Sequence, residues 1–258
     1  MKKSVSQIKD FLKNIPITDV INELEQFEND ERKSVQTVVE QYQKKYNSYL
    51  SEISRLDEIS SYEKKYYQSG IEFIAGIDEV GRGPLAGPVV ASAVILPKDC
   101  KIIGINDSKK LSEKKRQELF YEIKDKAIAI GVGVVSNILI DEINILQATY
   151  EAMRVAISKL EVVPNQLLVD AVTIPNVNIH QEGIIKGDAK SISIAAASII
   201  AKVTRDEMMK KYAEVYDGYF FEKNKGYGSK EHIEAIKNIG LCPIHRKSFT
   251  KNFVDWFI

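Results

Sequence analysis

The distribution of glycine along the chain is the feature that most limits its fold. All 14 glycines of the 258 residues lie at position 70 or later, and Pro16 is the single proline before that point. Glycine and proline are the residues that cost most inside a helix, so a long stretch that lacks them favours helices. We therefore predict an all-helical N-terminal extension over residues 1–70 and a second domain over residues 71–258.

Apolar residues recur at three- and four-residue steps through this extension, as in amphipathic helices. Residues 4–14 predict a short helix ended by Pro16, and residues 18–29 predict a second with Asp19 as its cap. A long helix is expected from Asp30 to Gln68, closed by Gly70. With 11 basic and 12 acidic residues, the extension favours packing or protein contact over contact with DNA.

Residues after Gly70 show the pattern of an α/β domain. Two segments rich in branched apolar residues, 71–78 and 88–96, flank a glycine-rich turn and predict an antiparallel hairpin. Further strands are expected at 128–136 and 165–171. Helices are expected at 111–127, with Ser112 as its cap, and at 141–160, 193–216 and 229–240. The prediction is a mixed sheet flanked by helices, with a C-terminal helical segment.

Composition excludes several classes of protein. The 36 basic and 36 acidic residues balance, which argues against a purely electrostatic nucleic-acid coat. No run of about 18 apolar residues predicts a membrane span, and the N-terminus lacks the apolar core of a secretory signal. Cys100 and Cys242 stand apart, as expected in a reducing cytoplasm. The three histidines have no ligand spacing, so oxygen ligands and hence Mg²⁺ or Mn²⁺ are expected for any metal.

Four carboxylates interrupt apolar segments. Asp78 and Glu79 follow an expected strand, Asp170 ends another, and Asp188 precedes the helix at 193–216. Carboxylates at such places are costly unless positive charge meets them, and a divalent cation does this best. Two cations about 4 Å apart can hold the attacking and leaving oxygens of a phosphodiester. The chain has no nucleophile motif and no P-loop, which favours this metal chemistry.

The adjacent pair Asp78 and Glu79 raises a geometric difficulty. Neighbouring residues on a regular strand point to opposite faces, so both serve one site only if the strand bulges or ends there. Gly81 and Gly83 follow at once and favour such an irregular end. Glycine also lets backbone groups approach a ligand closely.

Six blocks of sequence, in order, resemble the type 2 ribonucleases H, the ribonuclease HII family. They are GIDEVGRGPLAGPVV at 76–90, DSKKLS at 107–112, LLVDA at 167–171, IIKGDAKSISIAAASIIAKVTRD at 184–206, NKGYGSKEHIEAI at 224–236 and HRKSF at 245–249. The resemblance implies a ribonuclease-H-like fold and endonucleolytic cleavage of RNA in RNA–DNA hybrids. It also implies incision at ribonucleotides embedded in duplex DNA, leaving a 3′-hydroxyl and a 5′-phosphate.

Carried onto matching positions, the resemblance assigns roles to individual residues. The metal-site carboxylates would be Asp78, Glu79, Asp170 and Asp188. The turn of Gly81, Arg82 and Gly83 would sense the ribose 2′-hydroxyl, which is what distinguishes RNA from DNA at one nucleotide. Tyr227 would stack beside the sugar, although Gly228 stands where the family often has proline. The first 70 residues resemble a helical extension of some bacterial members.

Several basic or hydroxyl side chains are candidates for phosphate contact, each beside a structural alternative. Lys109 and Lys110 precede a helix N-terminus and could bind a phosphate, or form a solvated loop. Lys186 could balance the carboxylates. Ser198, Lys202 and Arg205 share one helix face and could follow a nucleic-acid backbone, or pair with acids such as Asp206.

Two further segments have structural interpretations. His245 and Arg246 are expected to make structural hydrogen bonds, and Trp256 is expected to fill the core, with a sliding-clamp contact of the apolar tail as the alternative. The chain is expected to be a cytoplasmic monomer. Two other functions stay open: a binding protein of the same fold without catalysis, and a DNA strand-transfer enzyme.

Overall fold

The structure, a computed structural model, describes residues 3–252, so the prediction for Trp256 lies outside the described residues. The chain divides into two compact units, Met1–Glu58 and Ile59–Ile258. This division precedes the boundary predicted at residue 70, and the helix α4 (Ser61–Gln68) lies on its C-terminal side. The single helix expected from Asp30 to Gln68 is instead two helices, α3 (Lys33–Ile59) and α4, with Ser60 between them.

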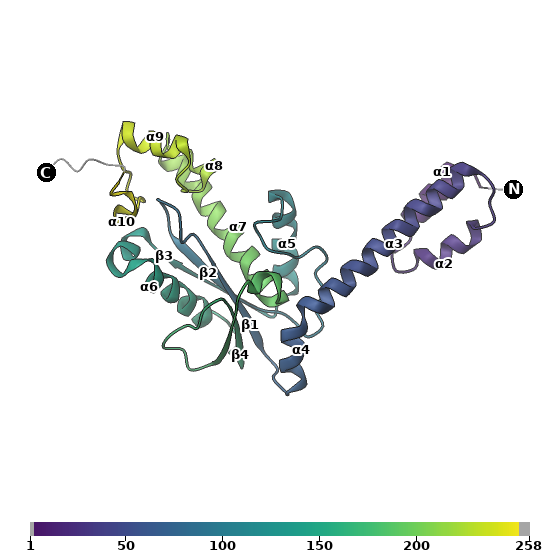
Figure 1. Cartoon of the computed structure of the whole chain (residues 1–258), viewed down its shortest axis with the longest axis horizontal. Helices are drawn as coiled ribbons and strands as arrows, with labels where there is room; N and C mark the ends of the chain where they lie inside the picture. The colour runs from purple at the N-terminus through teal and green to yellow at the C-terminus, as the bar shows by residue number, and fades with distance from the viewer. Residues whose placement is uncertain (1–2, 253–258) are drawn as a thin grey trace. The chain divides into compact units, whose positions relative to one another are not determined.

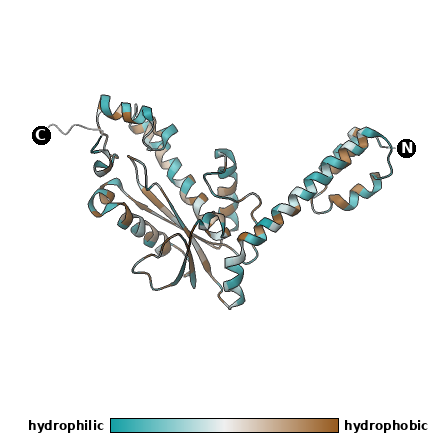
Figure 2. Ribbon diagram, viewed as in Figure 1, coloured by the Kyte–Doolittle hydropathy of each residue, from teal (hydrophilic) through white to brown (hydrophobic). Residues whose placement is uncertain are grey.

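The N-terminal unit is a small helical structure with its own core. It contains α1 (Val5–Lys13), α2 (Val20–Leu24), a 3-10 turn (Glu25–Phe27) and most of α3. Ser4 and Gln7 form a capping box at the start of α1, whereas Asp19 at the start of α2 makes no side-chain capping bond. Figure 2 shows these helices banded with hydrophobic and hydrophilic residues. The buried residues that form the core are Ile8, Leu12, Val20, Leu24, Phe27, Val35 and Val38.

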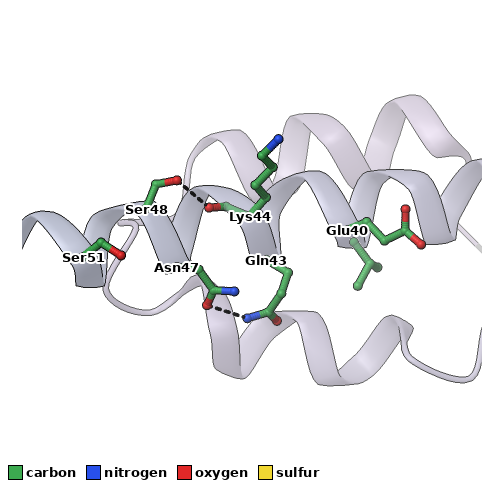
Figure 3. Close-up of a pocket in the computed structure, with 7 residues that line it drawn as sticks. Glu40, Gln43, Lys44, Asn47, Ser48 and Ser51 are labelled. Atoms are coloured by element: carbon green, nitrogen blue, oxygen red, sulfur yellow. Dashed lines mark hydrogen bonds between the residues drawn. The ribbon is translucent and has the colours of Figure 1, made fainter.

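A shallow hollow of about 520 Å³ lies on α3 (Figure 3). Two hydrogen bonds order its wall, from the Gln43 amide to Asn47 Oδ1 at 3.2 Å and from the Ser48 hydroxyl to the Lys44 carbonyl at 2.9 Å. Its other lining residues are Val39, Glu40 and Ser51. None of the residues that the sequence predicted for the functional site lines this hollow.

The C-terminal unit is built on a five-stranded mixed sheet in the order β3-β2-β1-β4-β5. The strands are β1 (Ile74–Val80), β2 (Val89–Ile95), β3 (Ala129–Val135), β4 (Gln166–Asp170) and β5 (His180–Ile184). The first two form the predicted antiparallel hairpin, β3 extends it antiparallel to β2, and β4 and β5 add in parallel. The edge strand β5 was not predicted, because its sequence HQEGI lacks an apolar pattern.

Helices cover both faces of this sheet (Figure 1). On one face lies α6 (Asn137–Ser158), whose Ala152 and Met153 belong to the same buried cluster as Ala75 and Ile77 of β1. On the other face lies α7 (Ile192–Val215), whose first half is buried as predicted. The remaining elements are α5 (Glu113–Lys126), a 3-10 turn η2 (Gly187–Ala189), α8 (Phe221–Asn224), α9 (Lys230–Ile239) and α10 (Lys247–Thr250).

The predicted cap of α5 is confirmed, whereas the helix expected at 141–160 begins at Asn137, four residues earlier, behind Ser136, which caps it. Ser112, the predicted cap of α5, accepts a hydrogen bond from the Lys115 amide at 3.2 Å. Within residues 3–252, no helix combines the length and the apolar character needed to cross a membrane.

Gly76 in β1 allows α7 to approach the sheet closely. A Cβ atom added at Gly76 would lie 2.0 Å from the backbone carbon of Ser193. Backbone atoms cannot move aside as a flexible side chain can, so any larger residue would push α7 away. The position of α7 therefore depends on this glycine.

We predict that Gly76→Ala lowers the free energy of unfolding by about 1–3 kcal/mol, because overpacking displaces α7. Urea unfolding of the full-length protein measures the change. Gly83→Ala is the control, since a Cβ there would have its nearest neighbour at 3.9 Å. Equal stability of the two variants would contradict the prediction.

Candidate active site

The strand register brings two of the predicted carboxylates to neighbouring strand ends. The last paired residues of β1 and β4 are Ile77 and Val169, and Asp78 and Asp170 directly follow them. Pairing with β2 continues without a bulge through Val80. The expected bulge or strand end at Asp78 and Glu79 is therefore wrong: β1 runs regularly to Val80, and only its pairing with β4 ends at Ile77.

Asp78 is buried and held by two hydrogen bonds. It is 6% exposed, its Oδ1 accepts from the Glu79 amide at 2.7 Å, and the Ser198 hydroxyl also bonds its carboxylate. Burial raises the pKa of Asp78 well above its usual value, and the charges of Glu79 and Asp170 raise it further. Three carboxylates thus act on one another here, and this cluster favours a cation.

Glu79 carries the clearest sign of a missing positive partner. Its Oε1 lies 3.2 Å from Arg82 Nη1, but its Oε2 is buried without a hydrogen-bond partner. Burial raises the pKa of Glu79, and the bond to Arg82 lowers it in part. An unpaired buried carboxylate oxygen is costly, and a cation bound beside it would remove that cost.

The turn η2 connects Asp170 to Asp188. The Gly187 amide donates to Asp170 Oδ1 at 2.7 Å, and Asp188 is the next residue. Burial raises the pKa of Asp188, as do the charges of Asp107 and Asp170, whereas Lys109 lowers it. The charge of Asp170 therefore acts on each of the other three predicted carboxylates, and the charge of Asp107 also acts on Asp188.

The sequence analysis did not select Asp107 or Ser108, although both lie in the DSKKLS block. Ser108 Oγ lies 2.9 Å from Ser198 Oγ, and Ser198 in turn bonds Asp78. The signal that could have identified them is the position of that block directly before the capped helix α5. The loop 107–112 thus supports the carboxylates as well as presenting lysines.

The donor set fits a divalent cation. The carboxylates offer only oxygen, which Mg²⁺ and Mn²⁺ prefer, and the orphaned Oε2 of Glu79 is the group that a cation would satisfy. Within residues 3–252, no group of three or more His, Cys, Asp or Glu side chains is arranged closely enough to hold a metal ion.

Two buried guanidinium groups hold the turn that follows β1. Arg246 donates to the carbonyls of Gly81 at 2.6 Å, Arg82 at 2.9 Å and Gly87 at 3.0 Å. Arg205 donates to the carbonyls of Pro88 at 2.9 Å, Lys225 at 2.9 Å and Ala86 at 3.1 Å. Both arginines are 0% exposed. The shape of the turn is therefore fixed by side chains from α7 and from the C-terminal segment.

Gly81 is required by this arrangement. Its φ is +92°, and an added Cβ would lie 2.3 Å from Nε of Arg205 and 2.8 Å from the Pro88 carbonyl oxygen. Any other residue at position 81 would push the Arg205 guanidinium away from the carbonyls that it bonds. Burial, together with the charge of Arg205, lowers the pKa of Arg246 to about 9, so Arg246 stays charged at neutral pH.

Tyr227 lies beside the same turn. Its side chain is 42% exposed, its Cε1 would be 3.9 Å from a Cβ on Gly83, and its ring centroid is 5.9 Å from the Arg205 guanidinium. The preceding residue, Gly226, accepts a hydrogen bond from the Leu85 amide at 2.8 Å. The loop is thus tied to the turn despite Gly228.

A buried histidine pair anchors the backbone of Tyr227. The Nδ1 of His232 lies 2.8 Å from the Tyr227 carbonyl oxygen, and the two Nε2 atoms of His232 and His245 are 3.0 Å apart. The Cys242 amide donates to His245 Nδ1 at 2.9 Å. These partners require Nε2 of His245 to donate to His232, so both rings are neutral. His245 and Arg246 make the structural hydrogen bonds that the sequence analysis expected.

The remaining predicted residues lie in different settings. Lys109, Lys110 and Lys186 are exposed. Lys202 pairs with Asp206 at 2.8 Å, which was the alternative to phosphate contact, and Arg205 bonds carbonyls rather than acids. Ser198 is 5% exposed and bonded inside the protein, so its predicted phosphate contact has no support from its position.

Comparison with known proteins identifies the family. Residues 75–252 match the family described as Ribonuclease HII, and residues 4–67 match the Ribonuclease HII N-terminal domain. The chain belongs to the ribonuclease HII family. Family membership supports endonuclease activity on RNA in RNA–DNA hybrids and makes the chain a hydrolase.

Relatives of the ribonuclease HII family match nearly the whole chain. Ribonuclease HII of Clostridioides difficile is 54% identical over 98% of this chain and 99% of its own. Ribonuclease HII of Lachnoclostridium phytofermentans is 56% identical over 94% and 99%. A PCNA:RNase HII complex from Archaeoglobus fulgidus is 28% identical with a TM-score of 0.58, covering 69% of this chain and 94% of that one. The predicted ribonuclease-H-like fold is confirmed.

We predict that Arg246→Lys destabilises this ribonuclease HII chain by about 2 kcal/mol or more, because an ammonium cannot serve three diverging carbonyls. Urea unfolding measures the change. Arg82→Lys is the control, because the Arg82 side chain is 46% exposed. Similar stability of Arg246→Lys and wild type would show that the carbonyls find other donors.

We predict that this histidine pair makes the protein less stable in acid. Burial and the neighbouring His232 lower the pKa of His245 to about 4, below the usual 6.5. The unfolded chain therefore takes up a proton that the folded chain refuses. The contribution of His245 to the free energy of unfolding is complete above pH 6.5. About 3 kcal/mol of it is lost as the pH falls toward 4.

This acid sensitivity is measured by urea unfolding between pH 7.5 and 4.5. His245→Gln is expected to lose part of the pH dependence, whereas the exposed His180→Gln is expected to keep it. The same slope in wild type and His245→Gln would refute the assignment.

Proposed function

We propose that the chain nicks duplex DNA on the 5′ side of an embedded ribonucleotide, and cleaves RNA in RNA–DNA hybrids, leaving a 3′-hydroxyl and a 5′-phosphate. The observation that carries this proposal is the position of the turn 81–83 directly after the two carboxylates of β1. A ribose contacting the turn would have its neighbouring phosphate beside Asp78 and Glu79. Recognition and cleavage would then occur at one end of one strand.

The turn has backbone donors available for a sugar hydroxyl. The carbonyls of Gly81 and Arg82 accept from Arg246, which leaves amides rather than carbonyls for a ligand. Within the described residues, the Arg82 and Gly83 amides donate no hydrogen bond. An amide can bind the oxygen of a 2′-hydroxyl, and DNA lacks that oxygen. Tyr227, exposed beside Gly83, would pack on the sugar.

The four carboxylates would hold one or two divalent cations, Mg²⁺ or Mn²⁺. Once bound, such cations supply a Lewis acid that lowers the pKa of the attacking water and neutralises the leaving oxygen. Ser198 and the Gly187 amide orient Asp78 and Asp170 for this task. Arg82 neutralises Glu79 before the substrate arrives and lies where it could then turn to a phosphate.

We assign the exposed residues Lys109, Lys110 and Lys186 to phosphate contact. Lys109 already acts on Asp188, whose pKa its charge lowers. Lys202 would reach a phosphate only by leaving Asp206.

A sliding-clamp contact is a further part of the proposal. The Archaeoglobus fulgidus relative was solved as a complex with PCNA. The apolar tail that the sequence analysis assigned to this contact lies outside the described residues.

The test is a DNA duplex that carries one ribonucleotide, incubated with Mn²⁺ or Mg²⁺. A nick on the 5′ side of the ribonucleotide is expected, and an all-DNA duplex is expected to stay intact. Asp78→Asn is expected to abolish nicking but keep duplex binding, because the cations lose a ligand. Asp125→Asn, an exposed residue of α5, is the matched control. Binding without a nick by folded wild type would favour the non-catalytic alternative.

A further inference from the structure

The helix α4 carries a buried carboxylate that the proposed mechanism does not use. Glu63 is 3% exposed, and its Oε1 accepts hydrogen bonds from the Ser191 hydroxyl at 2.5 Å and from the Ser193 amide at 3.0 Å. Its Oε2 is buried without a partner. Ser191 caps α7, so Glu63 holds the N-terminus of that helix, where a negative charge is favourable.

Hydrogen bonds continue from this point to the candidate active site. The Ser191 amide donates to the Gly187 carbonyl at 2.8 Å, and the Gly187 amide donates to Asp170 Oδ1 at 2.7 Å. Asp188 lies within the same segment, between Gly187 and Ser191. The turn that orients Asp170 and carries Asp188 is therefore fixed at its far end by Glu63.

We propose that Glu63 is a positioning residue for Asp170 and Asp188, which it acts on through Ser191 and the turn η2. The proposal rests on the metal-dependent function proposed above and adds that α4 completes the site. Partners that orient metal ligands are commonly worth 10–100-fold in metal affinity when removed. Glu63 would serve both carboxylates at once, because one short segment connects them.

A second anchor of α4 makes the role of Glu63 separable from the packing of the helix. The Tyr66 hydroxyl donates to Glu182 Oε2 at 2.6 Å, and Lys65 Nζ lies 3.1 Å from the same oxygen. Glu182 lies on β5, and neither contact involves α7. Tyr66→Phe therefore loosens α4 without touching the path from Glu63 to Asp170.

The experiment titrates Mn²⁺ into the full-length protein without substrate and measures the binding by isothermal titration calorimetry. Glu63→Ala is expected to raise the Kd for Mn²⁺ by about 10–100-fold, with Tyr66→Phe close to wild type. Glu63→Gln keeps the Oε1 acceptor and is expected to stay within about threefold of wild type. The nicking activity of Glu63→Ala is expected to recover as the Mn²⁺ concentration is raised.

Three results would overturn the proposal: Mn²⁺ affinity of Glu63→Ala equal to wild type, equal weakening by Tyr66→Phe, or equal weakening by Glu63→Gln. If Glu63→Ala does not fold, Ser191→Ala removes the hydroxyl that donates to Glu63 Oε1, and an unchanged Kd would then refute the path through Ser191. Wild type that neither binds Mn²⁺ nor nicks would instead refute the proposed function, so the two failures are distinguishable.

Discussion

The two buried guanidinium groups of Arg205 and Arg246 are the interaction on which the turn after β1, residues 81–88, depends. Together they donate to six backbone carbonyls, and the described contacts give neither a carboxylate partner. Burying a cation is costly unless its donors are satisfied, so the carbonyls must converge on the arginines for the fold to be stable. The turn is thereby held in one shape before any substrate binds, and a ligand need not pay for ordering it.

The helix α7 connects this turn to the carboxylates. Along its length it presents its N-terminus to Glu63, Ser198 to Asp78, and Arg205 to the turn. Its close approach to β1 at Gly76 sets all three distances together. One rigid helix therefore holds both the carboxylates and the turn 81–83, and a site is most precise when such elements support it. The helix α4 belongs to the same structural unit, since Glu63 bonds Ser191 and Ser193 at the start of α7.

Sequence reasoning predicted most local structure, because hydrophobic period, glycine turns and caps are local signals. The hairpin, the helix α5 with Ser112, and the buried first half of α7 were all predicted from them. The break at Ser60 was missed, because the apolar spacing continues through it. The edge strand β5 was missed because pairing with β4, and not its own apolar pattern, makes it a strand.

The sequence by itself determined the family and the fold class, and it predicted the four carboxylates as site residues, since each is encoded by residues in short, ordered blocks. Only the tertiary structure decided which partners those residues have. Asp107 approaches Asp188, Ser198 turns inward to Asp78, and Glu63 reaches Ser191 across more than a hundred residues of chain. Such contacts depend on strand register and helix packing, and neither is encoded in the spacing of any one segment.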